Sequence, residues 1–132
     1  MSQLAFAGYT HVNLVVDDLE AAQAFYGDKL GLEALARPDF GGFPGLWYQL
    51  GNAQLHLSVV DAMPDWNGAK PHMALYVPRE EFEATVAAIK AAGVELTSDI
   101  REREDFGVPV QTAFLEDPAG NLIELTDVPT AS

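Results

Sequence analysis

Residues 114–125 read Phe114-Leu115-Glu116-Asp117-Pro118-Ala119-Gly120-Asn121-Leu122-Ile123-Glu124-Leu125. The middle of this stretch, 117–121, is dense in turn-forming residues, so we expect the chain to reverse there and continue as a strand. Side chains alternate along a strand, which places Glu124 on the face opposite Ile123 and Leu125. A carboxylate among apolar neighbours is costly to bury unless a cation meets it. We therefore expect a metal ion at Glu124, bound also by the chain's three histidines.

Composition indicates a single globular domain over 1–132. Of the 132 residues, 48% are apolar and 20% charged, and there is no cysteine, which excludes disulfides and thiolate ligands. The first residues do not form a basic, apolar leader, and no apolar run approaches the about 20 residues of a membrane helix. We expect a cytoplasmic protein. The formal charge of −13, from 20 acidic and 7 basic residues, argues against nucleic-acid and membrane partners.

The first half of the chain begins with a strand followed by a helix. Residues 10–16 alternate in period two, with His11 and Asn13 on one face. Asp17 or Asp18 can cap a helix over 19–30. Gly31 then suits the left-handed conformation that often ends a helix.

The second half repeats this pattern. Residues 71–77 form the next expected strand, with His72 and Tyr76 on one face, and Pro78 suits the first turn of a helix over 79–92. Gly93 ends that helix. The spacing from histidine to glycine is 20 residues in the first half (11 to 31) and 21 in the second (72 to 93). The sequence therefore indicates an internal repeat of one structural unit.

Each half closes with further strands, at 46–50 and 53–60 in the first and at 110–115 and 122–126 in the second. Both units read βαβββ, and the segment Leu55-His56-Leu57 matches Ile123-Glu124-Leu125 in position. We predict an α+β fold of two modules, 8–60 and 71–128, joined by a linker over 61–70. Their sheets are expected to form an open cup, lined by the faces that carry the histidines and Glu124.

The predicted metal ligands are His11, His56, His72 and Glu124. A single histidine on a strand is more often a structural residue, but here all three lie at the start or end strands of matching units, on the predicted cup face. Imidazole and carboxylate suit Zn, Ni, Mn, Co or Fe, and the ligands alone do not choose among these divalent ions.

The sequence resembles the vicinal oxygen chelate superfamily, which includes glyoxalase I, bleomycin- and fosfomycin-resistance proteins, methylmalonyl-CoA epimerase and extradiol dioxygenases. The residues that carry the resemblance are His11, Ala24-Phe25-Tyr26, Leu30-Gly31-Leu32, His72 and the segment 117–125. The resemblance implies paired βαβββ modules, one divalent metal ion per site and a homodimer in which modules of two chains often pair.

By position, His11, His72 and Glu124 match the superfamily's most widespread ligands. His56 stands where glyoxalase I typically has a glutamate. The resemblance therefore implies either a His3Glu ligand set or a two-His-one-carboxylate set with His56 beside it.

Three functions follow, ranked in this order. The first is a glyoxalase-type isomerase or lyase that acts on a small substrate with vicinal oxygens through a metal-stabilised enediolate, with Glu124 as the base. Because only 7 residues are basic and no arginine follows His11 in its strand, a highly anionic substrate is a poor match.

The second is an Fe(II) extradiol dioxygenase with a triad of His11, His72 and Glu124. The expected histidine before the turn is missing and Phe114 takes the tyrosine position, so Tyr76 or His56 would have to substitute. The third is a non-enzymatic drug binder of the bleomycin-resistance type, in which aromatic residues stack on a flat ligand. The candidate aromatics are Trp47, Trp66, Phe40, Phe43 and Phe106.

The residues expected to bind the substrate line the same cup. They are Asn13, Gln54, Ser58, Tyr76, Phe114 and Trp47. Two segments are further candidates for substrate contact, a Gly-, Pro- and Phe-rich flap at 37–45 and residues 101–106.

Overall fold

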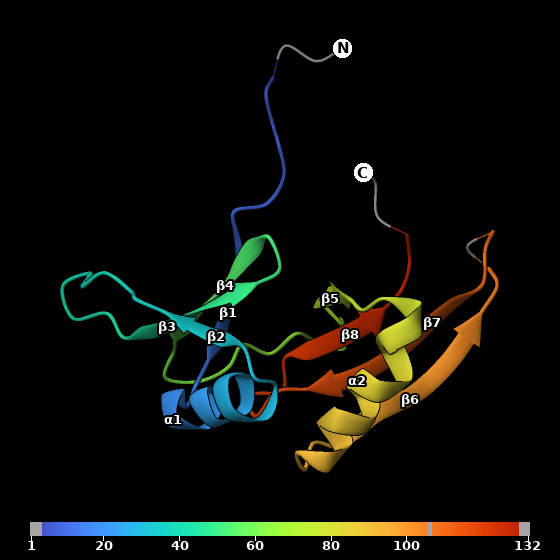
Figure 1. The fold of residues 1–132 in the computed structure, drawn as a ribbon. Coiled ribbons are helices and arrows are strands. Elements are labelled where there is room, and N and C mark those ends of the chain that lie inside the picture. Colours follow the sequence, from blue (N-terminus) through green and yellow to red (C-terminus); the bar gives the residue numbers. More distant parts are fainter. Residues whose placement is uncertain (1–3, 106, 130–132) are drawn as a thin grey trace.

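The computed structural model describes residues 4–105 and 107–129. Two four-stranded sheets stand beside each other, with the helices on the lower side of the view in Figure 1. The elements are β1 (His11–Val16), α1 (Leu19–Gln23), η1 (Ala24–Lys29), β2 (Glu33–Leu35), β3 (Gly45–Leu50), β4 (Ala53–Val59), β5 (His72–Tyr76), α2 (Arg79–Ala91), β6 (Leu96–Arg103), β7 (Val110–Glu116) and β8 (Leu122–Thr126).

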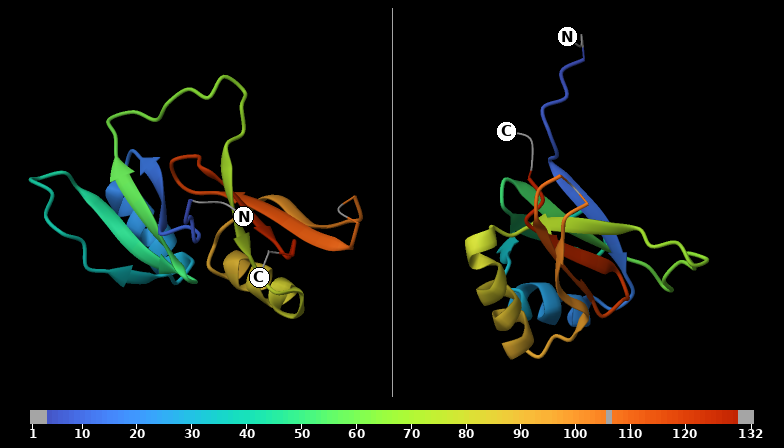
Figure 2. Two further views of the ribbon diagram at one scale, coloured as in Figure 1. Left: turned by 90° about the horizontal axis from the view of Figure 1, so that it is seen from above. Right: turned by 90° about the vertical axis from the view of Figure 1, so that its right-hand side faces the viewer.

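The two sheets have the same topology. Their strand orders are β1-β4-β3-β2 and β5-β8-β7-β6. In each sheet the first strand runs parallel to the last, and the other pairs are antiparallel. The predicted α+β fold with two βαβββ units is confirmed. Figure 2 shows the connection from β4 to β5 arching over from one sheet to the other.

The first helix begins where the sequence predicts but changes its winding. The Asp18 carboxylate accepts a hydrogen bond from the Ala21 amide at 3.1 Å, as an N-cap does. After Gln23 the helix becomes the π-helical segment η1, in which the Leu30 amide donates to the Phe25 carbonyl five residues earlier at 2.9 Å. Both aromatic rings of this wide turn, Phe25 and Tyr26, are buried.

One continuous hydrophobic core serves both units. The first sheet contributes Leu55, Leu57 and Tyr48, and the second contributes Leu115, Ile123 and Leu125, with α2 packing Phe82 and Val86 against them. Because both sheets turn their helix-covered faces to this core, their open faces lie on its outside. No helix in the described ranges is long and apolar enough to span a bilayer.

The turn at 117–121 forms as predicted and also joins the two units. The Asp117 carboxylate accepts hydrogen bonds from the amides of Ala119 and Asn121, at 3.0 and 2.8 Å. Its second oxygen accepts the Tyr26 hydroxyl from η1 at 2.6 Å and the Asn121 side-chain amide at 2.9 Å. The same amide donates to the Val15 carbonyl of β1 at 2.8 Å. Two elements of the first unit, η1 and β1, are thus held by hydrogen bonds to one turn of the second unit.

The edge strands include the first strand of each sheet, β1 and β5. β1 and β5 are the terminal strands of their sheets, and within residues 4–105 and 107–129 no strand pairs with the outer edge of either. The segment 4–10 that precedes β1 extends away from the body of the molecule (Figure 1) and exposes the large side chains of Leu4, Phe6 and Tyr9.

Candidate functional site

The open face of the first sheet carries a stack of three rings. Asn13 and Trp47 are the direct cross-strand neighbours of His56, on β1 and β3. The Trp47 ring lies 4.0 Å from the His56 ring with 5° between the planes, and the His11 ring lies 4.0 Å from His56 on its other side, at 15°. His56 is therefore sandwiched between the two other rings, and it is 9% exposed.

Each histidine of this stack has one ring nitrogen engaged by a neighbour. His56 Nε2 lies 2.8 Å from the Gln54 side-chain oxygen, and His11 Nδ1 lies 2.9 Å from the Thr10 hydroxyl. The other nitrogen of each ring is left for a ligand, an arrangement typical of metal-binding histidines. Burial lowers the pKa of His56, and His11 and Arg37 lower it further, so this imidazole is neutral at neutral pH.

A cavity of about 480 Å³ opens in front of the stack. Asn13 and Ser58 line it together, because the Ser58 hydroxyl donates to the Asn13 side-chain oxygen at 3.1 Å. Two residues of the segment 37–45, Arg37 and Phe40, form another part of its wall.

The open face of the second sheet carries the other histidine and the glutamate. His72 Nδ1 donates to the Lys70 carbonyl at 2.9 Å, and His72 Nε2 lies 3.2 Å from Glu124 Oε1. The Glu124 side chain is 14% exposed and that of His72 is 39% exposed. Phe114 approaches the His72 ring edge-on, with the ring centres 6.0 Å apart. Tyr76 lies at the end of β5, the strand that begins with His72, and is 56% exposed.

The His72–Glu124 pair requires a proton or a metal ion between its two facing atoms. A carbonyl oxygen only accepts hydrogen bonds, so the proton on Nδ1 is fixed by Lys70 and the Nε2 of a neutral ring carries a lone pair. That lone pair faces a carboxylate oxygen at 3.2 Å. Either a second proton or a metal ion can lie there. Two ligand atoms at about 2.1 Å from one ion are about 3.0 to 3.4 Å apart for ordinary bond angles, so the pair fits two neighbouring metal ligands.

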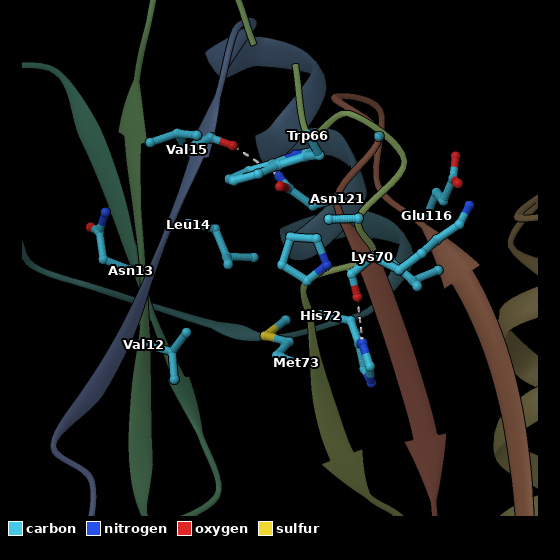
Figure 3. Close-up of a pocket in the computed structure, with 14 residues that line it drawn as sticks. Val12, Asn13, Leu14, Val15, Trp66, Lys70, His72, Met73, Glu116 and Asn121 are labelled. Atoms are coloured by element: carbon cyan, nitrogen blue, oxygen red, sulfur yellow. Dashed lines mark hydrogen bonds between the residues drawn. The ribbon is translucent and has the colours of Figure 1, made fainter. Parts of the chain in front are cut away.

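A second cavity, of about 440 Å³, lies between β1 and β5. Figure 3 shows Leu14 and Met73 pointing into this space, whereas Asn13 and His72 point away from it. The cavity is therefore lined mainly by side chains on the sheet faces opposite to those that carry His11 and His72. Trp66 and Asn121 close its upper side in this view.

One chain does not bring the four predicted ligands together. In the part of the chain that the structure describes, no group of three or more His, Asp or Glu side chains is arranged to hold a metal ion. The predicted ligand set of His11, His56, His72 and Glu124 therefore remains a prediction. Period-two counting correctly assigned each to an open face, but the two open faces lie outside the shared core and present one pair each.

The substrate-binding candidates divide in the same way. Four lie on the first sheet's open face, namely Asn13, Gln54, Ser58 and Trp47, and two lie on the second's, namely Tyr76 and Phe114. Among the other aromatics, Phe43 and Trp66 are exposed, and Phe106 lies outside the described residues.

Sequence reasoning selected the segment 37–45 but not Arg37 itself. The Arg37 guanidinium lies over the Phe40 ring, with its Cζ 4.8 Å from the ring centre, and its Nη1 donates to the Phe43 carbonyl at 2.7 Å. The available signal was that Arg37 is the sole cationic residue of the segment.

The fold has many counterparts among solved structures. A glyoxalase family protein from Bacillus anthracis is 29% identical with a TM-score of 0.75, covering 95% of this chain and 98% of its own. A fosfomycin resistance protein, FosX, from Listeria monocytogenes is 21% identical with a TM-score of 0.74, covering 92% and 93%. A lactoylglutathione lyase from Agrobacterium tumefaciens is 22% identical with a TM-score of 0.69, covering 91% and 92%.

The last two likenesses show the fold alone. No curated protein sequence matches this chain at a significant level. The family model described as Glyoxalase/Bleomycin resistance protein/Dioxygenase superfamily matches residues 8–125, which include His11, His56, His72 and Glu124 and nearly all of both βαβββ units. The chain therefore belongs to the glyoxalase/bleomycin resistance protein/dioxygenase superfamily.

Proposed function

We propose that this protein is a divalent-metal-dependent enzyme of the glyoxalase type, an isomerase or lyase acting on a small substrate that carries two adjacent oxygens. The observation that carries the proposal is the His72–Glu124 pair, whose facing nitrogen and oxygen atoms lie 3.2 Å apart, the spacing of two neighbouring metal ligands. The lyase from Agrobacterium tumefaciens and FosX have the same fold, which is compatible with this chemistry without specifying it.

The proposal requires two chains. A catalytic metal site in a protein usually has three protein ligands, and among the described residues each open face offers one pair of candidates. We infer a homodimer in which His11 of one chain completes the set formed by His72 and Glu124 of the partner. Such a closed two-chain assembly is the commonest form of protein oligomer.

His56 is best explained as a neighbour of the metal site and not as a ligand. The lone pair of an imidazole nitrogen lies in the plane of its ring, and the His11 and His56 planes are 15° apart at a separation of 4.0 Å. Nearly parallel lone pairs at that spacing do not meet at one ion about 2.1 Å away. This supports the two-His-one-carboxylate set, with His56 holding the orientation of His11 by stacking.

Each residue then has a defined task. A divalent ion bound by His11, His72 and Glu124 would supply the positive charge that stabilises an oxyanion when a proton leaves the substrate. Glu124 accepts that proton, and its largely buried side chain favours proton transfer away from bulk water. Asn13 and Ser58 supply neutral hydrogen-bonding groups at the cavity wall.

Subunit complementation tests the arrangement. Neither the His11→Ala chain nor the Glu124→Gln chain has an intact site by itself, in one chain or between two identical chains. After the two variants are unfolded and refolded together, about half of the dimers are mixed, and each mixed dimer has one intact composite site. Metal binding by calorimetry should recover to about a quarter of the wild-type stoichiometry.

The control is a mixture of His72→Ala and Glu124→Gln chains. Both changes lie in the same half-site, so no combination of these chains rebuilds a complete set. Recovery in this control, or no recovery in the first mixture despite mixed dimers detected by native mass spectrometry, would exclude a site built from two chains.

A second candidate function is Fe(II)-dependent ring cleavage. The stacking of His56 favours it, because the remaining ligands would form the two-His-one-carboxylate set that such oxygenases use. Oxygen uptake with a panel of catechols after loading with Fe(II) distinguishes this activity from isomerisation, which consumes no oxygen.

A further inference from the structure

The segment 37–45 places the charged side chain of Arg37 at the wall of the cavity in front of the ring stack. Three contacts fix the Arg37 guanidinium there. Its Cζ lies 4.8 Å from the centre of the Phe40 ring, and its Nη1 donates to the Phe43 carbonyl at 2.7 Å. It also packs against Gly45, where a Cβ atom would come within 2.9 Å of Nε and 3.0 Å of Cζ. Because these contacts already restrict the side chain, little further conformational entropy is lost when it binds a ligand.

The charge of Arg37 is not balanced by a carboxylate. Arg79, Lys90 and Arg103 each form an ion pair with an acidic side chain. Arg37 forms none with any described residue of this chain, and its Nε is buried without a hydrogen-bond partner. In a chain with 20 acidic and 7 basic residues, a fixed and uncompensated guanidinium inside a cavity is a position suited to an anion.

The rest of the cavity wall defines what accompanies that anion. Phe40 and Trp47 contribute aromatic surface, with their ring centres 6.0 Å apart. Asn13 and Ser58 contribute neutral polar groups. A ligand that uses all of these has one anionic group, a flat apolar part and at most a few neutral oxygens.

We propose that Arg37 binds a single carboxylate group of the substrate and thereby selects small monoanions with a planar or apolar part. This inference rests on the proposed function for its meaning as substrate selection. The composition of the chain already disfavours a highly anionic substrate. Arg37 adds that a substrate with one anionic group is favoured, because one guanidinium matches one such group and not several.

Anion binding is tested on metal-free protein, which separates it from metal binding and catalysis. In a Trp66→Phe background, Trp47 is the remaining tryptophan and reports on the cavity by fluorescence, and calorimetry gives an independent affinity. The probes are phenylacetate and phenylacetamide, which have nearly the same shape but differ in charge. We expect phenylacetate to bind about tenfold more tightly, the discrimination typical of one charge-assisted contact.

Variants at Arg37 test whether this residue causes the preference for phenylacetate over phenylacetamide. Arg37→Gln should make the two affinities equal, and Arg37→Lys should retain part of the preference because the charge remains without the planar fork. The ratio of the two affinities is the readout, since loosening of the segment 37–45 alone would weaken both probes alike. Lys29→Gln removes the same charge at the far end of η1 and should leave the ratio unchanged.

The outcomes distinguish this inference from the proposed function. A wild-type ratio near one, or a preference that survives in Arg37→Gln, overturns the role of Arg37 whatever the metal experiments give. A preference that depends on Arg37 supports the anion site even if subunit complementation fails, in which case the proposed enzyme is abandoned and the anion site remains.

Discussion

Replacing Tyr26 by phenylalanine should measure how strongly the turn at 117–121 ties the two βαβββ units together. The Tyr26 hydroxyl is fully buried and donates to the Asp117 carboxylate at 2.6 Å. Burial, and then the charge and the hydrogen bond of Asp117, raise the pKa of Tyr26 far above its usual value, so the hydroxyl remains a donor throughout the accessible pH range. The variant removes this donor and leaves the packing of the ring intact.

The expected cost follows from the partners that remain. Hydrogen bonds to charged groups contribute about 1.5–3 kcal/mol, and Asp117 keeps three other donors after the change. We therefore expect a loss of about 2 kcal/mol in the free energy of unfolding in urea. For a chain of this length the melting temperature should fall by about 6–10 °C.

Tyr48→Phe is the matched control. Tyr48 is also buried, its ring lies 6.3 Å from that of Tyr26, and its hydroxyl makes no hydrogen bond to any described residue. This change should cost less than about 0.5 kcal/mol. Equal losses in the two variants would refute the reasoning, because they would show that removing a tyrosine hydroxyl has the same cost with or without a bond to Asp117.

Three further predictions concern the ligand pairs and the cavity. Glu124→Gln should keep the fold, lower the affinity for divalent ions at least tenfold in calorimetry and abolish proton-transfer activity, whereas Glu116→Gln on the neighbouring strand should change neither. Gly45→Ala should destabilise the protein by about 1–3 kcal/mol, because the added Cβ would lie 2.5 Å from a backbone oxygen. In Gly27→Ala the added Cβ would meet its nearest atom at 3.4 Å, so this control should be tolerated. Equal melting temperatures of the two variants would contradict this prediction. Because the pKa of His56 is lowered in the folded chain, its contribution to stability is complete above the ordinary value of 6.5 and is lost as pH falls through the folded value, so urea titrations should show a steeper acid loss in wild type than in His56→Gln.

The repeated unit was predictable from the sequence because its signals are local. Strand alternation, the Asp18 cap and the left-handed glycines at 31 and 93 depend on neighbouring residues only. The same holds for the turn around Asp117, whose proline, glycine and asparagine act within five residues. Period-two counting therefore assigned His11, His56, His72 and Glu124 to the correct faces.

The relative placement of the two units could not be predicted in this way. Whether the open faces of two sheets meet depends on how their helix-covered faces share a core, and that is decided by side chains far apart in sequence, such as Phe25 and Leu115. The widening of the first helix into η1 was equally inaccessible, because an apolar stripe of period 3.6 does not reveal an extra residue in one turn. The role of Arg37 depends on contacts with Phe40 and Gly45 that only the folded segment defines.

The open edges of β1 and β5 have a consequence for assembly beyond the binding site. In residues 4–105 and 107–129 neither edge has a further strand partner, so each can serve as a template for another polypeptide. If β1 of one molecule pairs with β5 of a second and the reverse pairing also occurs, the assembly closes on itself. If the pairing is made in one direction only, each added molecule exposes a fresh edge and a filament grows. A geometry that closes the ring would therefore also protect this protein from polymerisation.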